Sequence, residues 1–204
     1  MRIHDPPSII SRAFRALRRF LPTSIGLYLE KLLPEWFLPP TFILKTQKPN
    51  WEEEFEHERV AYTRLEPVQG VYVPRYIGCV WNGNRPAHVL SDIGGHSLST
   101  PAGAVLAPED FDRLMLETFN ALGSCLVLHD DLKMDNYHLV GNKIMAVDME
   151  MTGTHWEEVP VKPIEMLVKY LGERYRDHID GLECMGTRLP TIHLQNAEHI
   201  FPAR

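Results

Sequence analysis

Cysteine is scarce in this sequence, and its spacing excludes two common kinds of small domain. Cys79, Cys125 and Cys184 are scattered and odd in number, so they form neither a disulfide framework nor a zinc-binding pattern. No apolar run is long enough to span a bilayer. Arginines interrupt the apolar stretch near the start, unlike a secretory signal. We therefore expect an intracellular protein in the reducing cytoplasm.

An excess of positive charge is also absent. The chain carries 21 Lys and Arg against 27 Asp and Glu, which gives a formal net charge of −6 at pH 7. An acidic chain repels a phosphate backbone, so we expect no nucleic-acid partner. Hydrophobic residues make up 44% of the sequence, enough for one sizeable core or two small lobes.

Residues 1–40 depart from this acidic average, because they hold six basic residues against three acids. Apolar residues recur there at helical spacing and predict an amphipathic helix. We expect this helix to pack against the rest of the chain; contact of residues 8–21 with a membrane surface is the alternative. The apolar face consists of Ile10, Ala13, Phe14 and Leu17.

A β-hairpin is predicted in the middle of the chain. Residues 137–140 and 143–147 are rich in β-forming side chains, and the dipeptide Gly141-Asn142 between them signals a two-residue turn. Counting outward from this turn, Asn136 faces Val147 across the two strands.

Polar side chains gather at the open end of this hairpin. Asn136 precedes the first strand, Asp148 follows the second, and Asp131 and Lys133 lie in the loop just before the first. Phosphoryl transfer needs a carboxylate to orient the attacking hydroxyl, a cation beside the moving phosphate and oxygen ligands for Mg²⁺. The spacing therefore predicts a phosphoryl-transfer site; a solvated polar loop is the alternative.

Two segments carry a resemblance to a known family. His129-Asp130-Asp131-Leu132-Lys133-Met134-Asp135-Asn136 resembles the catalytic loop of protein kinases, and Val147-Asp148-Met149-Glu150 is similar to their metal-binding Asp-Phe-Gly segment. The chain most resembles short fungal kinase-like proteins, between Ser/Thr protein kinases and phosphotransferases of the aminoglycoside type. This resemblance implies an α+β, bilobal kinase-like fold trimmed at both ends, with a small antiparallel sheet and one main helix in the N-lobe and a mostly helical C-lobe.

The resemblance also implies roles for individual residues. Asp131 would be the catalytic base and Lys133 a contact to the γ-phosphate of ATP, while Asn136 and Asp148 would bind Mg²⁺. His129 is expected to brace the loop. Two departures stand out: Asp130 replaces the usual Arg, and Met149-Glu150 replaces Phe-Gly.

A lysine and a glutamate upstream form a second candidate pair. Residues 41–45 predict a strand that ends in Lys45, and residues 51–65 predict a helix with Glu58 on its apolar face. A glutamate should not be buried there unless it is paired. Kinases pair such residues to hold the α- and β-phosphates, so we carry that role onto Lys45 and Glu58. Glu54 is the main alternative to Glu58.

The following segment predicts two strands and a link between lobes. Residues 71–81 and 87–91 read as strands around a turn at residues 82–84. Pro74 confines pairing near it to a sheet edge or a strand start. The arrangement is similar to the last N-lobe strand and hinge of kinases, which implies that adenine contacts the backbone of Ser91, Asp92 and Ile93. A plain strand ending in a Gly-Gly turn is the alternative.

Helical patterns dominate the remainder. Helices are predicted from Pro108 onward and over residues 164–176. We expect a basic helical segment at 1–40, an N-lobe-like part at 41–93 and a C-lobe-like part at 94–204. The first of the two C-lobe helices has an apolar face formed by Phe111, Leu114, Met115, Thr118, Phe119 and Leu122.

Two kinase features are missing. No Gly-x-Gly-x-x-Gly stands before Lys45, where Gly26 is the only glycine, and no Ala-Pro-Glu follows Asp148. The leading hypothesis is an ATP- and Mg²⁺-dependent phosphotransferase that acts on a hydroxyl of a protein or a small molecule. The alternatives are a pseudokinase that binds nucleotide or protein without transferring phosphate and, less favoured, a metal-dependent phosphohydrolase built on His129-Asp130.

Overall fold

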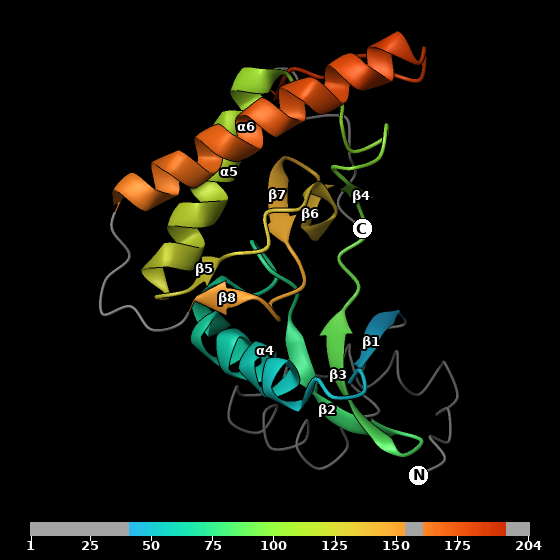
Figure 1. Cartoon of the computed structure of the whole chain (residues 1–204), viewed down its shortest axis with the longest axis vertical. Coiled ribbons are helices and arrows are strands. Elements are labelled where there is room, and N and C mark those ends of the chain that lie inside the picture. The colour runs from blue at the N-terminus through green and yellow to red at the C-terminus, as the bar shows by residue number, and fades with distance from the viewer. Residues whose placement is uncertain (1–40, 154–160, 195–204) are drawn as a thin grey trace, which may run out of the picture. The chain divides into compact units, whose positions relative to one another are not determined.

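The computed structural model describes residues 41–153 and 161–194, and these residues form an α+β fold (Figure 1). Its sheets are small and antiparallel, and the described part contains three α-helices. The helix predicted within residues 1–40 lies outside the described residues. In chain order the elements are β1 (Phe42–Thr46), α4 (Glu52–Arg64), the 3₁₀ turn η1 (Glu66–Val68), β2 (Tyr76–Asn82), β3 (Arg85–Ser91), β4 (His96–Ser97), α5 (Pro108–Ser124), β5 (Leu128–His129), the 3₁₀ turn η2 (Met134–Asn136), β6 (Tyr137–Val140), β7 (Lys143–Ala146), β8 (Thr152–Gly153) and α6 (Val161–Cys184).

The chain divides into two compact units. Of the described residues, the first unit contains 41–46 and Ile77–Asp92, and the second contains Gln47–Tyr76, 93–153 and 161–194. The helix α4 groups with the second unit, although it follows the first strand in sequence. The predicted lobe boundaries stay a prediction.

The first unit is a three-stranded sheet in the order β1-β3-β2. The strand β1 pairs antiparallel with β3, with Lys45 opposite His88. Gly83 adopts a positive φ of 64° in the turn between β2 and β3, a conformation that glycine adopts without strain. The second predicted strand, residues 87–91, is confirmed as β3, which begins two residues earlier than expected.

The predicted strand over residues 71–81 is wrong in its first half. Only β2 is extended, and residues 71–75 form a loop. In this loop Val73 makes an isolated bridge with Gln69, and the strand does not continue through Pro74, which has no N–H to donate to a sheet. The side chain of Gln69 holds the loop, because its Oε1 accepts a hydrogen bond from the backbone N–H of Tyr76 at 2.8 Å.

Helix α4 matches its prediction to within one residue at each end. Trp51 and Leu65 are its N- and C-caps, and three glutamates in the first turn interact favourably with the helix dipole. Glu58 and Tyr62 face the interior and are fully buried. The helix therefore carries a carboxylate into the core.

The helices α5 and α6 pack against each other (Figure 1). Every residue of the apolar face predicted for α5 is buried. The rings of Phe111 and Tyr175 stack with their centroids 4.1 Å apart. Helix α6 extends beyond the predicted residues 164–176, because its stop signal is Gly186, whose positive φ of 67° ends the helix. None of the described helices combines the length and apolar character needed to cross a bilayer.

The predicted hairpin is confirmed as β6 and β7. Val140 pairs with Lys143, and the backbone N–H of Val147 donates to the carbonyl of Asn136 at 2.8 Å. Asn136 therefore faces Val147, as expected. Gly141 has a φ of 60° at the first position of the turn, which is where a type II′ turn requires a positive value.

Candidate functional site

A cavity of about 350 Å³ in the second unit contains both carboxylates predicted for catalysis and metal binding. Four carboxylates and two lysines line it, a formal surplus of two negative charges. This surplus attracts a divalent cation and repels a free polyphosphate. The volume lies at the lower end of the range for small-molecule sites. The lining residues are Lys48, Trp51, Asp130, Asp131, Lys133, Asp148, Glu150 and Met151.

Asp131 and Lys133 form an ion pair in this cavity. The Nζ of Lys133 donates to Oδ2 of Asp131 at 2.8 Å. This hydrogen bond holds the pKa of Asp131 below its usual value, and the same contact raises the pKa of Lys133. Both groups are therefore charged at neutral pH, and the Asp131 carboxylate acts as a hydrogen-bond acceptor.

Asn136 contacts the loop that carries Asp131. Its side chain is only 7% exposed, and its Nδ2 donates to the backbone carbonyl of Asp131 at 3.1 Å. The bond directs the amide nitrogen toward this carbonyl, so the amide oxygen points away from it. Asn136 is linked to the cavity through Asp131, because it does not itself belong to the lining described above.

Asp148 has an unusual backbone conformation. Its φ of 61° lies in the left-handed region, which costs on the order of 1 kcal/mol or more for residues other than glycine, although Asp and Asn tolerate it best. Such strain persists only where the surrounding structure holds it, and it is common at functional sites. Here it accompanies a turn of the chain that leaves both Asp148 and Glu150 lining the cavity.

His129 contacts this turn through its ring. It is fully buried, and its Nε2 lies 3.1 Å from the carbonyl oxygens of both Val147 and Asp148. Both oxygens are acceptors, so Nε2 carries the proton, and Nδ1 accepts a hydrogen bond from the Tyr137 hydroxyl at 3.3 Å. Burial lowers the pKa of His129 and keeps it neutral. The ring has the contacts of a brace, as expected, and does not line the cavity.

Glu58 holds the same turn from α4. It is fully buried, and its Oε1 accepts the backbone N–H of Met149 at 3.2 Å. A charged acceptor of this kind offsets part of the cost of burying the carboxylate. The alternative residue Glu54 is partly exposed. Lys45 lies on β1 in the other unit, and its pairing with Glu58 stays a prediction.

The predicted hinge residues lie at the end of β3. Ser91 is the last residue of this strand, Asp92 follows it, and Ile93 begins the second unit. Gly94 and Gly95 both have positive φ, and a Cβ on Gly95 would lie 2.3 Å from a backbone oxygen of β6. The two glycines therefore follow the end of β3, and the adenine contacts stay a prediction.

Five lining residues have no counterpart among the predicted site residues: Lys48, Trp51, Asp130, Glu150 and Met151. The Nζ of Lys48 donates to Oε2 of Glu150 at 2.7 Å and lies 4.4 Å from the ring centroid of Trp51. Lys48 and Glu150 are separated by 102 residues, so no local spacing signals their contact. The sequence provides no pattern from which this wall of the cavity follows.

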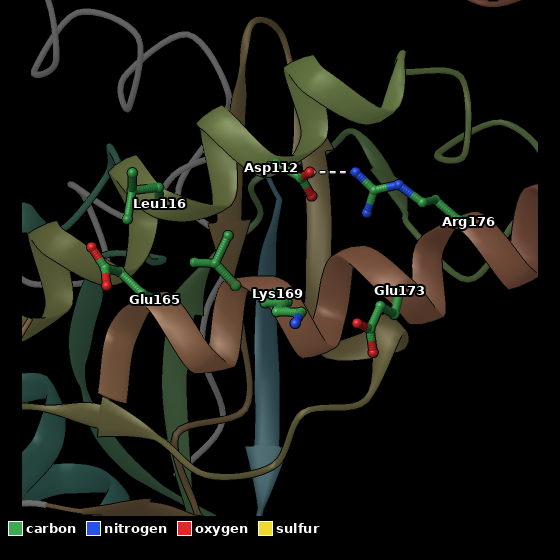
Figure 2. Close-up of a pocket in the computed structure, with 7 residues that line it drawn as sticks. Asp112, Leu116, Glu165, Lys169, Glu173 and Arg176 are labelled. Atoms are coloured by element: carbon green, nitrogen blue, oxygen red, sulfur yellow. Dashed lines mark hydrogen bonds and ion pairs between the residues drawn. The ribbon is translucent and has the colours of Figure 1, made fainter. Parts of the chain in front are cut away.

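A second hollow, of about 480 Å³, lies between α5 and α6 and contains none of the predicted site residues. Figure 2 shows Arg176 of α6 reaching Asp112 of α5 along one edge. Gly172 gives these side chains room, because a Cβ there would lie 2.3 Å from Oδ1 of Asp112. The contact joins the two helices and has no link to the candidate site.

Neither a scan against models of known protein families nor a search of curated proteins finds a match for this sequence. The described residues also contain no group of three or more His, Cys, Asp and Glu placed to hold a metal ion. The predicted magnesium ligands, Asn136 and Asp148, fall outside this criterion, because they are two residues and one of them is an asparagine. They provide hard oxygen donors, and Mg²⁺ characteristically takes its other ligands from water and substrate phosphates.

Proposed function

We propose that this protein is an ATP- and Mg²⁺-dependent phosphotransferase with a bilobal, protein kinase-like fold. It would transfer the γ-phosphoryl group of ATP to a hydroxyl acceptor. The register of the β6–β7 hairpin carries the proposal, because it places Asn136 and Asp148 at one end, next to the Asp131–Lys133 pair. Asp131, Lys133 and Asp148 line one cavity, and the side chain of Asn136 is bonded to the backbone of Asp131, which are the kinds of group that phosphoryl transfer needs.

In this function the ionised Asp131 orients the acceptor hydroxyl and takes its proton, since its pKa is held low by Lys133. Lys133 offsets negative charge on the transferred group. Asn136 and Asp148 would hold Mg²⁺, which when bound neutralises charge on the β- and γ-phosphates. Kinase chemistry is mainly positioning and electrostatic stabilisation, and these are what the four side chains provide.

Two buried side chains hold the turn at residues 147–149, which carries the proposed metal ligand Asp148. Glu58 on α4 and His129 on β5 bind consecutive backbone groups, the carbonyls of Val147 and Asp148 and the amide of Met149. The strained backbone of Asp148 is thereby fixed before any ligand arrives. Preorganisation of this kind lowers the cost of binding a transition state.

The acceptor would enter from the side of α6. Lys133 also lines a hollow of about 840 Å³ that includes Asp135 of the catalytic loop and Tyr170 and Asp177 of α6. An acceptor hydroxyl has to reach Asp131 beside Lys133, so this hollow is the space next to the reacting groups. Its size leaves both a protein segment and a small molecule as acceptors.

The remaining kinase features belong to the same proposal. Lys45 would pair with Glu58 to position the α- and β-phosphates, and adenine would contact the backbone of Ser91, Asp92 and Ile93. The chemistry also fits the reducing cytoplasm that the scattered cysteines indicate, since ATP is plentiful there.

The test is transfer of radiolabelled phosphate from ATP, or its hydrolysis, with and without Mg²⁺. Asp148→Asn keeps the side-chain shape and tolerates the left-handed backbone, and it should abolish Mg²⁺-dependent turnover. The matched control is Asp180→Asn, which changes an exposed acid on α6. Equal turnover in the two variants would contradict the proposal.

A pseudokinase is the second candidate, and the lack of a glycine-rich loop before Lys45 favours it. Melting temperatures that rise with ATP, without turnover, would support this alternative. A phosphohydrolase built on His129-Asp130 loses support, because both ring nitrogens of the buried His129 are already engaged.

A further inference from the structure

Lys48 is the second cation of the cavity, and the structure holds it in place. Its ammonium group donates to Glu150 at 2.7 Å and lies over the ring of Trp51. Glu150 is 11% exposed, whereas Lys48 is 50% exposed. The lysine is therefore anchored on a nearly buried carboxylate while its head remains open to the cavity.

The contacts of Lys48 leave it able to bind an anion. An ammonium group has three N–H donors. Glu150 accepts from one of them, and the face of Trp51 attracts the cation without accepting a conventional hydrogen bond. Two donors can therefore reach a phosphate oxygen without breaking the Glu150 contact.

The backbone at Lys48 forms a turn. The N–H of Trp51 donates to the carbonyl of Lys48 at 3.3 Å, and Asn50 between them has a φ of 61°. This turn leads directly into α4, whose Glu58 is bonded to Met149 next to Asp148. The turn at residues 48–51 is thus connected through α4 to the segment that carries Asp148.

We propose that Lys48, held by Glu150 and Trp51, binds the phosphate chain of the nucleotide. It would supply part of the phosphate contact that a glycine-rich loop provides in kinases and that this sequence lacks. The ligand class is a nucleoside di- or triphosphate bound with a divalent cation, because the cavity repels a bare polyphosphate. The inference rests on the proposed function, since it concerns the same site.

The experiment is calorimetric titration of the full chain with ATP, ADP and adenosine in the presence of Mg²⁺. Lys48→Met should weaken ATP and ADP binding by about 10- to 100-fold, the effect expected for loss of a charge-assisted hydrogen bond. Adenosine affinity should remain unchanged. Lys48→Arg should retain most of the affinity, and Lys169→Met, an exposed lysine of α6 (Figure 2), should behave as the wild type.

Three other outcomes would contradict the inference, and each has a different meaning. If Lys48→Met binds ATP as the wild type does, Lys48 does not contact phosphate, although the proposed function stands. If it weakens adenosine and ATP equally, or lowers the melting temperature as Lys48→Arg also does, its role is structural. A wild-type chain that binds no nucleotide overturns both the inference and the proposed function.

Discussion

The backbone N–H of Met149 donates to the carboxylate of Glu58 at 3.2 Å, across 91 residues of sequence. This bond links the centre of α4 to the residue that follows the candidate metal ligand Asp148. A movement of the helix would therefore be felt at the turn that carries Asp148. The carboxylate is fully buried, so the bond is shielded from water and stronger than an exposed one.

Substitutions of Glu58 should separate the hydrogen bond from the charge. Glu58→Gln keeps an acceptor for Met149 and should change the free energy of unfolding by less than about 1 kcal/mol. Glu58→Ala leaves the amide unpaired and should lower it by about 1–3 kcal/mol, with a further loss from the cavity. Urea denaturation measures both. Equal losses would show that the charge matters more than the acceptor.

Asp131→Asn should reduce turnover by about 10²- to 10⁴-fold, the usual contribution of a general base. Nucleotide affinity should be retained, because Asp131 is assigned to the acceptor hydroxyl. Asp130→Asn is the matched control, since Asp130 lines the same cavity. Phosphate transfer and nucleotide-induced melting shifts provide the two measurements. A similar loss in both variants would mean that cavity charge, and not Asp131 itself, sets the rate.

Lys133→Met should raise the pKa of Asp131 toward its ordinary value. The lysine favours the ionised form, so the native carboxylate stays charged to a lower pH than in the unfolded chain, and it loses this advantage without the cation. NMR titration of the Asp131 carboxyl carbon measures the shift, with Lys169→Met as the control. An unchanged titration would contradict the ion pair in solution.

His129 should make stability depend on pH in mildly acidic solution. Burial lowers the pKa of His129 in the folded protein, whereas the unfolded side chain titrates near its usual value of about 6.5. Below that pH His129 binds a proton in the unfolded chain, whereas in the folded chain it binds one only at a lower pH. The free energy of unfolding should therefore fall as pH drops through this window and level off above it.

His129→Gln removes this titration and keeps a donor for the two carbonyls. Its free energy of unfolding should be flatter than that of the wild type between about pH 5 and 7. The pKa of His138 is also lowered by burial, and His138 is present in both proteins, so the difference between the two curves isolates His129. Parallel curves would show that His129 is not protected from protonation.

Local patterns in the sequence predict much of the described fold. The turn dipeptide Gly141-Asn142 determines the register of the hairpin, and this register follows from counting residues. The apolar period of α5 identifies the face that is buried. The error at residues 71–75 also has a local cause, because Pro74 removes a donor from a segment that otherwise has strand composition.

The candidate site was only partly predictable for a physical reason. Asp131, Lys133, Asn136 and Asp148 belong to one hairpin and its flanks, so their proximity is a local property. The contact of Lys48 with Glu150 joins segments 102 residues apart and depends on how α4 packs. Long-range packing of this kind leaves no periodic signal in a single sequence, and the same holds for the bond from Met149 to Glu58.

The length of the two-residue turn between β6 and β7 determines which residues meet at the opposite end of the hairpin. One residue inserted between Gly141 and Asn142 would turn every side chain of the returning strand to the other side of the ribbon. Asn136 and Asp148 would then lie on different sides of the hairpin, although both residues would still be present. Length at a remote, solvent-facing bend is thus as firm a requirement as the identity of either oxygen donor.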